Sequence, residues 1–114
     1  MGMNATTFII VGITSTQMKK VNKSWLDKED FKTYSDLTDI DEWEFDDVPD
    51  VPFGYCACEG SHHEFLGFVI ASNGAGEYDI IDDDMLDTIN IAKRSSVWLE
   101  MGVTPRVLIH TGYT

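Results

Sequence analysis

The first hydrophobic segment of the chain, Thr6–Thr14, is β-branched, aromatic or aliphatic at nearly every position. Its apolar residues fall on both faces of an extended chain: Phe8 and Ile10 on one, Ile9, Val11 and Ile13 on the other. A run with no polar face predicts a strand that is central in its sheet or buried on both sides. Gly12 within it predicts a β-bulge or the close approach of another backbone.

The following segment, Gln17–Lys32, has poor apolar periodicity, which predicts loop mixed with short helix. Ser24 followed by Asp27 resembles a capping box and predicts a helix start. Beyond this segment, apolar residues recur every three positions and predict a second short helix that ends near Asp41: they are Phe31, Tyr34, Leu37 and Ile40.

Apolar and acidic residues alternate next, which predicts a half-buried strand with Trp43, Phe45 and Val48 facing inward. Pro49 and Pro52 are then expected to prevent regular structure between Val48 and Val51.

Two further runs, Phe53–Cys58 and Glu64–Ala71, predict an antiparallel hairpin around the turn residues 60–63. On the second strand, Phe65, Val69 and Ala71 share one face, while Leu66, Phe68 and Ile70 share the other. The turn Asn73–Gly76 precedes a short predicted strand, Glu77–Ile81.

Three consecutive carboxylates, Asp82–Asp84, predict a helix start, because they accept the free N–H groups of a first turn and complement the helix dipole. The helix is expected to reach about Met101, with Gly102 as its stop. Its apolar stripe is imperfect: Met85, Leu86, Ile89, Ala92, Val97 and Met101. Arg106–Tyr113 alternates as a final strand.

This order of elements predicts an α+β fold, a mainly antiparallel four- to five-stranded sheet with one long helix packed on it in two layers. The 114 residues suffice for one core, so residues 1–114 are interpreted as a single acidic domain. Hydrophobic residues make up 43% of the chain, which argues against intrinsic disorder despite the charge.

The charge is unevenly placed along the chain. Residues 33–92 hold 16 of the 20 acidic residues and no Lys or Arg, so this span carries −16 and the remainder +4 of the net −12. Such a field attracts and steers a basic partner. It also opposes direct nucleic-acid binding, which requires cations to neutralise phosphates.

No apolar run approaches the roughly 20 residues that cross a bilayer, and the N-terminus shows no charged region followed by an apolar region and a cleavage site. The sequence therefore predicts a cytoplasmic protein that binds no membrane.

One cluster has metal-ligand residue types: Cys56, Cys58, His62 and His63. Thiolate and imidazole suit zinc, but the spacing is tighter than that of zinc fingers and no second ligand pair follows. Cys58 beside His62, His63 or His110 lacks a nucleophile motif. We therefore expect no metal, no cofactor and no catalytic residues. The alternative is a small metal-dependent hydrolase using Cys56, Cys58 and His62 or the acidic cluster.

The densest acidic stretch is the candidate partner-binding segment, Asp39–Asp50. Its proposed binding residues are Asp39, Asp41, Glu42, Trp43, Glu44, Phe45, Asp46, Asp47 and Asp50. The competing interpretation is a solvated face in which Trp43 and Phe45 are only core anchors. In charge and size the chain is similar to phage-encoded DNA-mimic inhibitors and toxin-neutralising immunity proteins. The sequence thus predicts a small acidic inhibitor or immunity-type protein. Its expected partner is a basic protein, either a nucleic-acid-binding protein or a toxin, held by a carboxylate-rich, DNA-mimic-like surface.

Overall fold

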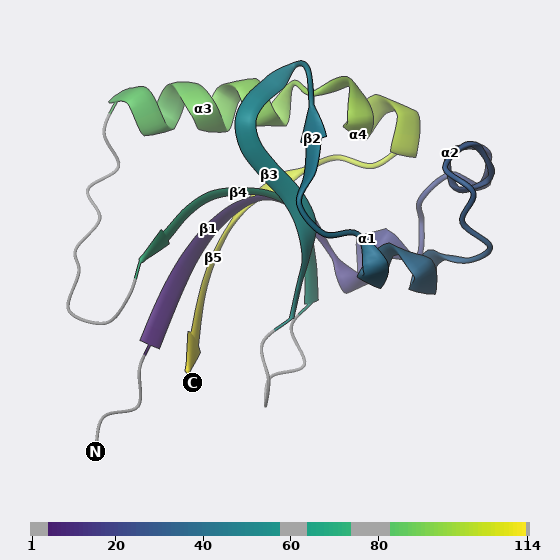
Figure 1. The fold of residues 1–114 in the computed structure, drawn as a ribbon, viewed down its shortest axis with the longest axis horizontal. Helices are drawn as coiled ribbons and strands as arrows, with labels where there is room; N and C mark the ends of the chain where they lie inside the picture. Colours follow the sequence, from purple (N-terminus) through teal and green to yellow (C-terminus); the bar gives the residue numbers. More distant parts are fainter. Residues whose placement is uncertain (1–4, 58–63, 74–82, 114) are drawn as a thin grey trace.

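A computed structural model describes residues 5–57, 64–73 and 83–113 of the chain (Figure 1). It has one five-stranded antiparallel sheet with strand order β2-β3-β4-β1-β5 and a bent helix packed on it. The strands are β1 (Ala5–Thr14), β2 (Trp43–Phe45), β3 (Val48–Ala57), β4 (Glu64–Asn73) and β5 (Arg106–Tyr113). The helices are α1 (Ser15–Met18), α2 (Lys23–Lys28), the 3-10 helix η1 (Tyr34–Asp39), α3 (Asp83–Lys93) and α4 (Ser96–Met101). The predicted α+β fold is confirmed.

β1 lies between β4 and β5, as its two apolar faces predicted. Ile9, Val11 and Ile13 belong to the core cluster beneath the helices. Ile10 lies on the opposite face and is also buried, between its cross-strand neighbours Val69 and Leu108.

Gly12 marks a close approach of two backbones. It pairs with Gly67 of β4, and a Cβ on Gly12 would lie 2.3 Å from the carbonyl oxygen of Leu66. A Cβ on Gly67 would lie equally close, 2.3 Å, to the carbonyl oxygen of Val11. The pairing shift of β1 and β4 falls instead between Ile9 and Ile10, so of the two alternatives for Gly12 the close approach is correct.

The expectation that Pro49 and Pro52 would interrupt regular structure is wrong, because β3 is extended from Val48 onward. Val48 pairs with Phe45 and Phe53 with Trp43, so β3 advances five residues while β2 advances two. Pairing of β3 with β4 begins only at Phe53. The two prolines thus lie where no partner needs their missing N–H groups.

The predicted long helix is present but bends at Ser95, between α3 and α4. At about 100° per residue, a straight helix would point Val97, Trp98 and Met101 away from the side of Met85, Ile89 and Ala92. The bend restores the phase, so both sets pack in one core. Inside the bend, the indole Nε1–H of Trp98 donates to the Ala92 carbonyl oxygen at 2.9 Å.

The two ends of the bent helix agree closely with the sequence prediction. Asp83 and Asp84 occupy the first turn of α3, and Gly102 ends α4 in the left-handed conformation with φ of 74°. η1 is the short helix expected before Asp41. The capping box predicted from Ser24 and Asp27 is wrong, because α2 begins at Lys23 after its N-cap Asn22, so Ser24 lies inside the helix. Asp82 and the predicted strand Glu77–Ile81 lie outside the described residues.

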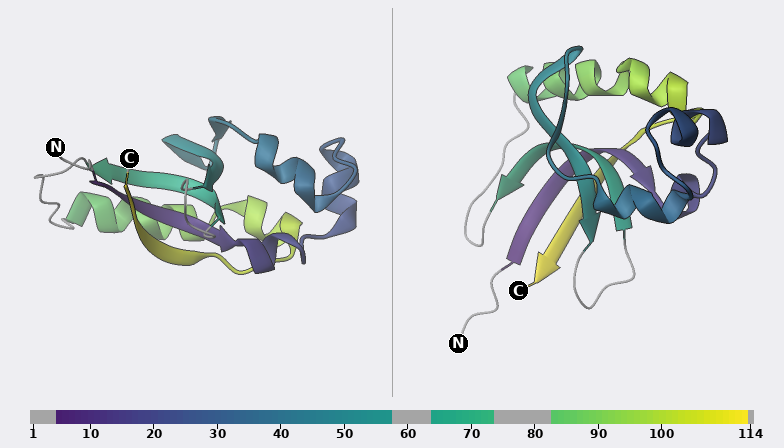
Figure 2. Two further views of the ribbon diagram at one scale, coloured as in Figure 1. Left: turned by 90° about the horizontal axis from the view of Figure 1, so that it is seen from below. Right: turned by 45° about the vertical axis from the view of Figure 1, so that its right-hand side comes forward.

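Aromatic rings of β2, β3 and β4 contact aromatic rings of α2 and α4. Figure 2 shows β2 and β3 along one margin of the molecule and β5 along the other, with α3 and α4 crossing the sheet. No helix in the described ranges is both long and apolar enough to cross a membrane.

Candidate interaction surface

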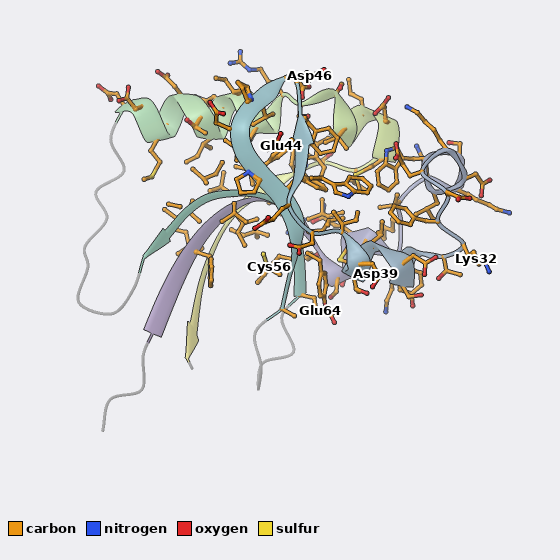
Figure 3. All side chains as sticks on the ribbon, in the orientation of Figure 1. Lys32, Asp39, Glu44, Asp46, Cys56 and Glu64 are labelled. Atoms are coloured by element: carbon orange, nitrogen blue, oxygen red, sulfur yellow. The ribbon has the colours of Figure 1, made fainter. Side chains whose placement is uncertain are left out.

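The acidic segment, Asp39–Asp50, runs from the end of η1 through β2 and into the start of β3. Figure 3 shows Asp39 beside η1, and Glu44 and Asp46 farther along, toward the β2–β3 turn near the helices. The segment therefore extends along the β2 side of the sheet as a continuous ribbon.

Aromatic stacking holds this ribbon to the core. Trp43 stacks on Phe31 with ring centroids 5.8 Å apart and an interplanar angle of 12°. Phe45 meets Phe53 and Phe68 edge-on at 5.1 and 5.7 Å. We call the connected rings the aromatic cluster: Trp25, Phe31, Trp43, Phe45, Phe53, Phe68 and Trp98. Each such pair contributes about 0.5–1.5 kcal/mol beyond its buried area.

Aliphatic and backbone contacts fix the two ends of the segment. The side chains of Ile40 and Val48 are buried in the core. The backbone N–H of Tyr55 donates to the Ile40 carbonyl oxygen at 2.9 Å. Gly54 allows this approach, since a Cβ there would lie 3.3 Å from that same oxygen. Trp43 and Phe45 are therefore anchors of the fold as well as members of the predicted binding set.

The carboxylates of the segment are exposed, and within β2 Glu44 alternates with the more buried Trp43 and Phe45. Six of them are exposed and form no ion pair or hydrogen bond with any described residue: Asp39, Asp41, Glu42, Glu44, Asp46 and Asp50. Among the described residues, the one ion pair joins Lys28 Nζ to Glu100 Oε1 at 3.1 Å, between α2 and α4. No described cation forms an ion pair with a carboxylate of the segment.

Asp47 differs from its neighbours because it contacts the helix bend. Its Oδ2 accepts from the Ser96 backbone N–H at 2.8 Å, and its Oδ1 from the Ser95 hydroxyl at 3.1 Å. Ser95 Oγ in turn accepts from Val97 N–H, so the two side chains cap the start of α4 together. The sequence offered no signal for this role, since the partners lie 48 and 49 residues away.

Two acids of the segment have left-handed backbone conformations, Glu42 with φ of 51° and Asp50 with φ of 64°. Asp tolerates this region better than Glu does. Both residues lie beside the shifted pairing of β2 with β3.

The Cys–His cluster is described only in part. Cys56 is half-buried on β3, whereas Cys58, His62 and His63 lie outside the described residues. Within the ranges that the structure describes, no three His, Cys, Asp or Glu side chains are grouped as metal ligands. Nearby, the Tyr55 hydroxyl donates to Glu64 Oε1 at 2.8 Å. Burial and then this hydrogen bond raise the pKa of Tyr55 to about 12, so the phenol stays protonated at neutral pH.

No protein-family model matches the chain, and no curated protein or solved structure is significantly similar to it. The functional argument therefore rests on the acidic segment alone.

Proposed function

We propose that this protein is a small acidic inhibitor or immunity-type protein that binds a basic, nucleic-acid-binding protein and is not itself an enzyme. One observation carries the proposal: six exposed carboxylates with no described cation partner stand on a ribbon that aromatic rings fix to the core.

A ribbon fixed in this way supports binding because it loses little conformational freedom when a partner docks. A carboxylate on a mobile tail would have to be ordered at that moment. Here, the stacking of Trp43 on Phe31 and the burial of Ile40 and Val48 order the backbone beforehand. Pre-ordered charges both steer the encounter and hold the register of the complex.

The chemistry of the surface indicates the class of partner. A protein that binds nucleic acid presents cations arranged for phosphates. A row of Asp and Glu side chains carries negative charge, as the phosphates of nucleic acid do, and holds it on short side chains with few rotatable bonds. Nucleic acid itself would be repelled by the net charge of −12.

The test compares two variants with the same change in charge. In the segment variant, Asp41, Asp46 and Asp50 become Asn and Glu44 becomes Gln. The control variant has Asn at Asp27, Asp30, Asp84 and Asp87, which are exposed and lie outside the segment. Each variant alters one residue of left-handed backbone, Asp50 or Asp30, both with φ of 64°. Asp47 is left unchanged because it caps α4.

The wild-type protein is immobilised, and proteins from a lysate of the source organism are bound at low salt and eluted at high salt. We expect the eluted protein to bind DNA or RNA on its own and to lose that binding when this protein is added. Electrostatically steered association reaches about 10⁸–10⁹ M⁻¹s⁻¹ at low salt, so the segment variant should lose on-rate and the control should keep most of it. A folded segment variant that associates as fast as wild type would reduce the segment to a solvated face.

A further inference from the structure

The two edge strands of the described sheet differ in how they are protected. β2 has three residues, and Glu42 precedes it with a positive φ. β5 has eight residues, RVLIHTGY, with no Pro, Asp or Glu. Natural sheets protect edges with short strands, charges, prolines and bulges, because a regular edge pairs with other strands. β5 has none of these devices after Arg106.

Two apolar side chains of β5 remain uncovered on the core-facing side. Val107 pairs with Val11 and Ile109 with Ile9, so both point to the face on which the helices pack. Even so, Val107 is 43% exposed and Ile109 is 67% exposed. The helical layer thus stops short of the β5 edge.

We propose that β5 pairs with β5 of a second copy in antiparallel register, with the two-fold axis at Ile109. In this register Ile109 faces Ile109 of the other copy, Val107 faces Thr111, and Arg106 faces Gly112. Residues of the same face then meet, so the uncovered apolar side chains pack together. No like charges are directly opposite, since Arg106 is the one formally charged residue of the strand.

The charge distribution permits two acidic chains to meet here. The acidic segment lies along β2, at the other edge of the sheet from β5 (Figure 2). Pairing would give a sheet of twice the width, with the two β2 strands about nine strand spacings, or ~43 Å, apart. This separation is several times the Debye length of about 8 Å at physiological salt, so repulsion between the two acidic segments is screened.

The same distribution favours a second copy over the basic partner at this edge. Lys93 and Arg94 line an open groove of about 380 Å³ together with Thr104 and Pro105, directly before β5. Arg106 begins the strand. A basic protein would meet these cations at β5 but carboxylates at β2, so the two edges have separate occupants.

The molar mass of the purified protein in solution, measured across a concentration series from micromolar to millimolar, tests the pairing. We expect wild type to approach twice the chain mass and Ile109→Lys to keep the mass of one chain. Leu99→Lys is the matched control, because Leu99 is 84% exposed but lies on α4. Wild type that stays at one chain mass, a folded Ile109→Lys that still dimerises, or a Leu99→Lys that is equally monomeric would overturn the proposal.

Oxidative cross-linking tests the register. Ile109→Cys should form covalent dimers several-fold more readily than Leu99→Cys, with the native cysteines present in both. Added salt should preserve or strengthen the dimer, whereas it weakens capture by the acidic segment, so the two proposals fail independently. Equal cross-linking of the two variants, or a dimer that salt dissociates, would contradict pairing through β5.

Discussion

Replacing Asp47 by Ala removes the carboxylate that joins the β2–β3 turn to the helix bend. Loss of an N-terminal cap costs about 0.5–2 kcal/mol. The hydroxyl of buried Ser95 also loses its acceptor, which adds to the cost. Because Asp47 is exposed, we take the low end of both contributions and expect a total of about 1–2 kcal/mol.

Asp46→Ala is the matched control. It removes the same charge at the neighbouring position, and the side chain of Asp46 has no described partner. Relief of repulsion should leave its stability unchanged or slightly raised, within about 0.5 kcal/mol. Asp47→Ala is therefore expected to lower the free energy of unfolding, whereas Asp46→Ala is not.

Urea unfolding of both variants, followed by circular dichroism, gives the two free energies of unfolding. A double-mutant cycle with Ser95→Ala should show a coupling energy of about 1 kcal/mol with Asp47, because the two side chains share the cap. If Asp47→Ala unfolds at the same urea concentration as Asp46→Ala, then Asp47 does not stabilise α4. It would then return to the set of carboxylates available to a partner.

Three further predictions concern other parts of the molecule. Trp43→Ala should lower the unfolding free energy by about 3 kcal/mol in urea titrations, because its ring stacks on Phe31 and contacts Trp25 of α2; a loss below ~1 kcal/mol would contradict its role as an anchor. Tyr55 has a pKa raised above its unfolded value of 10.0 to about 12, so its stabilising contribution is complete below pH 10 and is lost as pH rises to 12. In thermal melts, Tyr55→Phe should remove the part of the stability loss between pH 10 and 12 that Tyr55 causes. An unchanged pH dependence would show that the ionisation of Tyr55 does not cause this loss. Glu42→Gly should raise stability by about 0.5–1 kcal/mol, since glycine adopts a φ of 51° without strain, while Glu44→Gly in β2 should lower it. Equal changes in stability at the two positions would exclude relief of backbone strain as the cause of the effect of Glu42→Gly.

The fold was predictable where local patterns and packing agree. Residues apolar on both faces predicted the central place of β1, and carboxylates at a first turn predicted the start of α3. The bend at Ser95 was not predicted, although the stripe contained the signal. Val97 and Met101 are out of phase with Ile89 on one straight helix, so their burial requires a break.

Long-range partners explain what the sequence could not show. Pro49 and Pro52 were assigned by local rules to an interruption, but their tolerance depends on which neighbouring strand reaches them. The outward alternation of the acidic segment followed from periodicity. The separate role of Asp47 depends on a serine in another helix, and no local pattern encodes such a contact.

The aromatic cluster also makes the protein its own optical reporter. All three tryptophans of the chain belong to it, and the rings of Trp25 and Trp43 lie 6.4 Å apart. At that separation their excited states couple, so the far-ultraviolet dichroism should contain a signal that either Trp25→Phe or Trp43→Phe abolishes. Trp43 alternates with the exposed carboxylates, so a protein docking on them changes the surroundings of an emitting ring. The proposed association with a basic protein would then be measurable by intrinsic fluorescence, without a dye on the acidic surface.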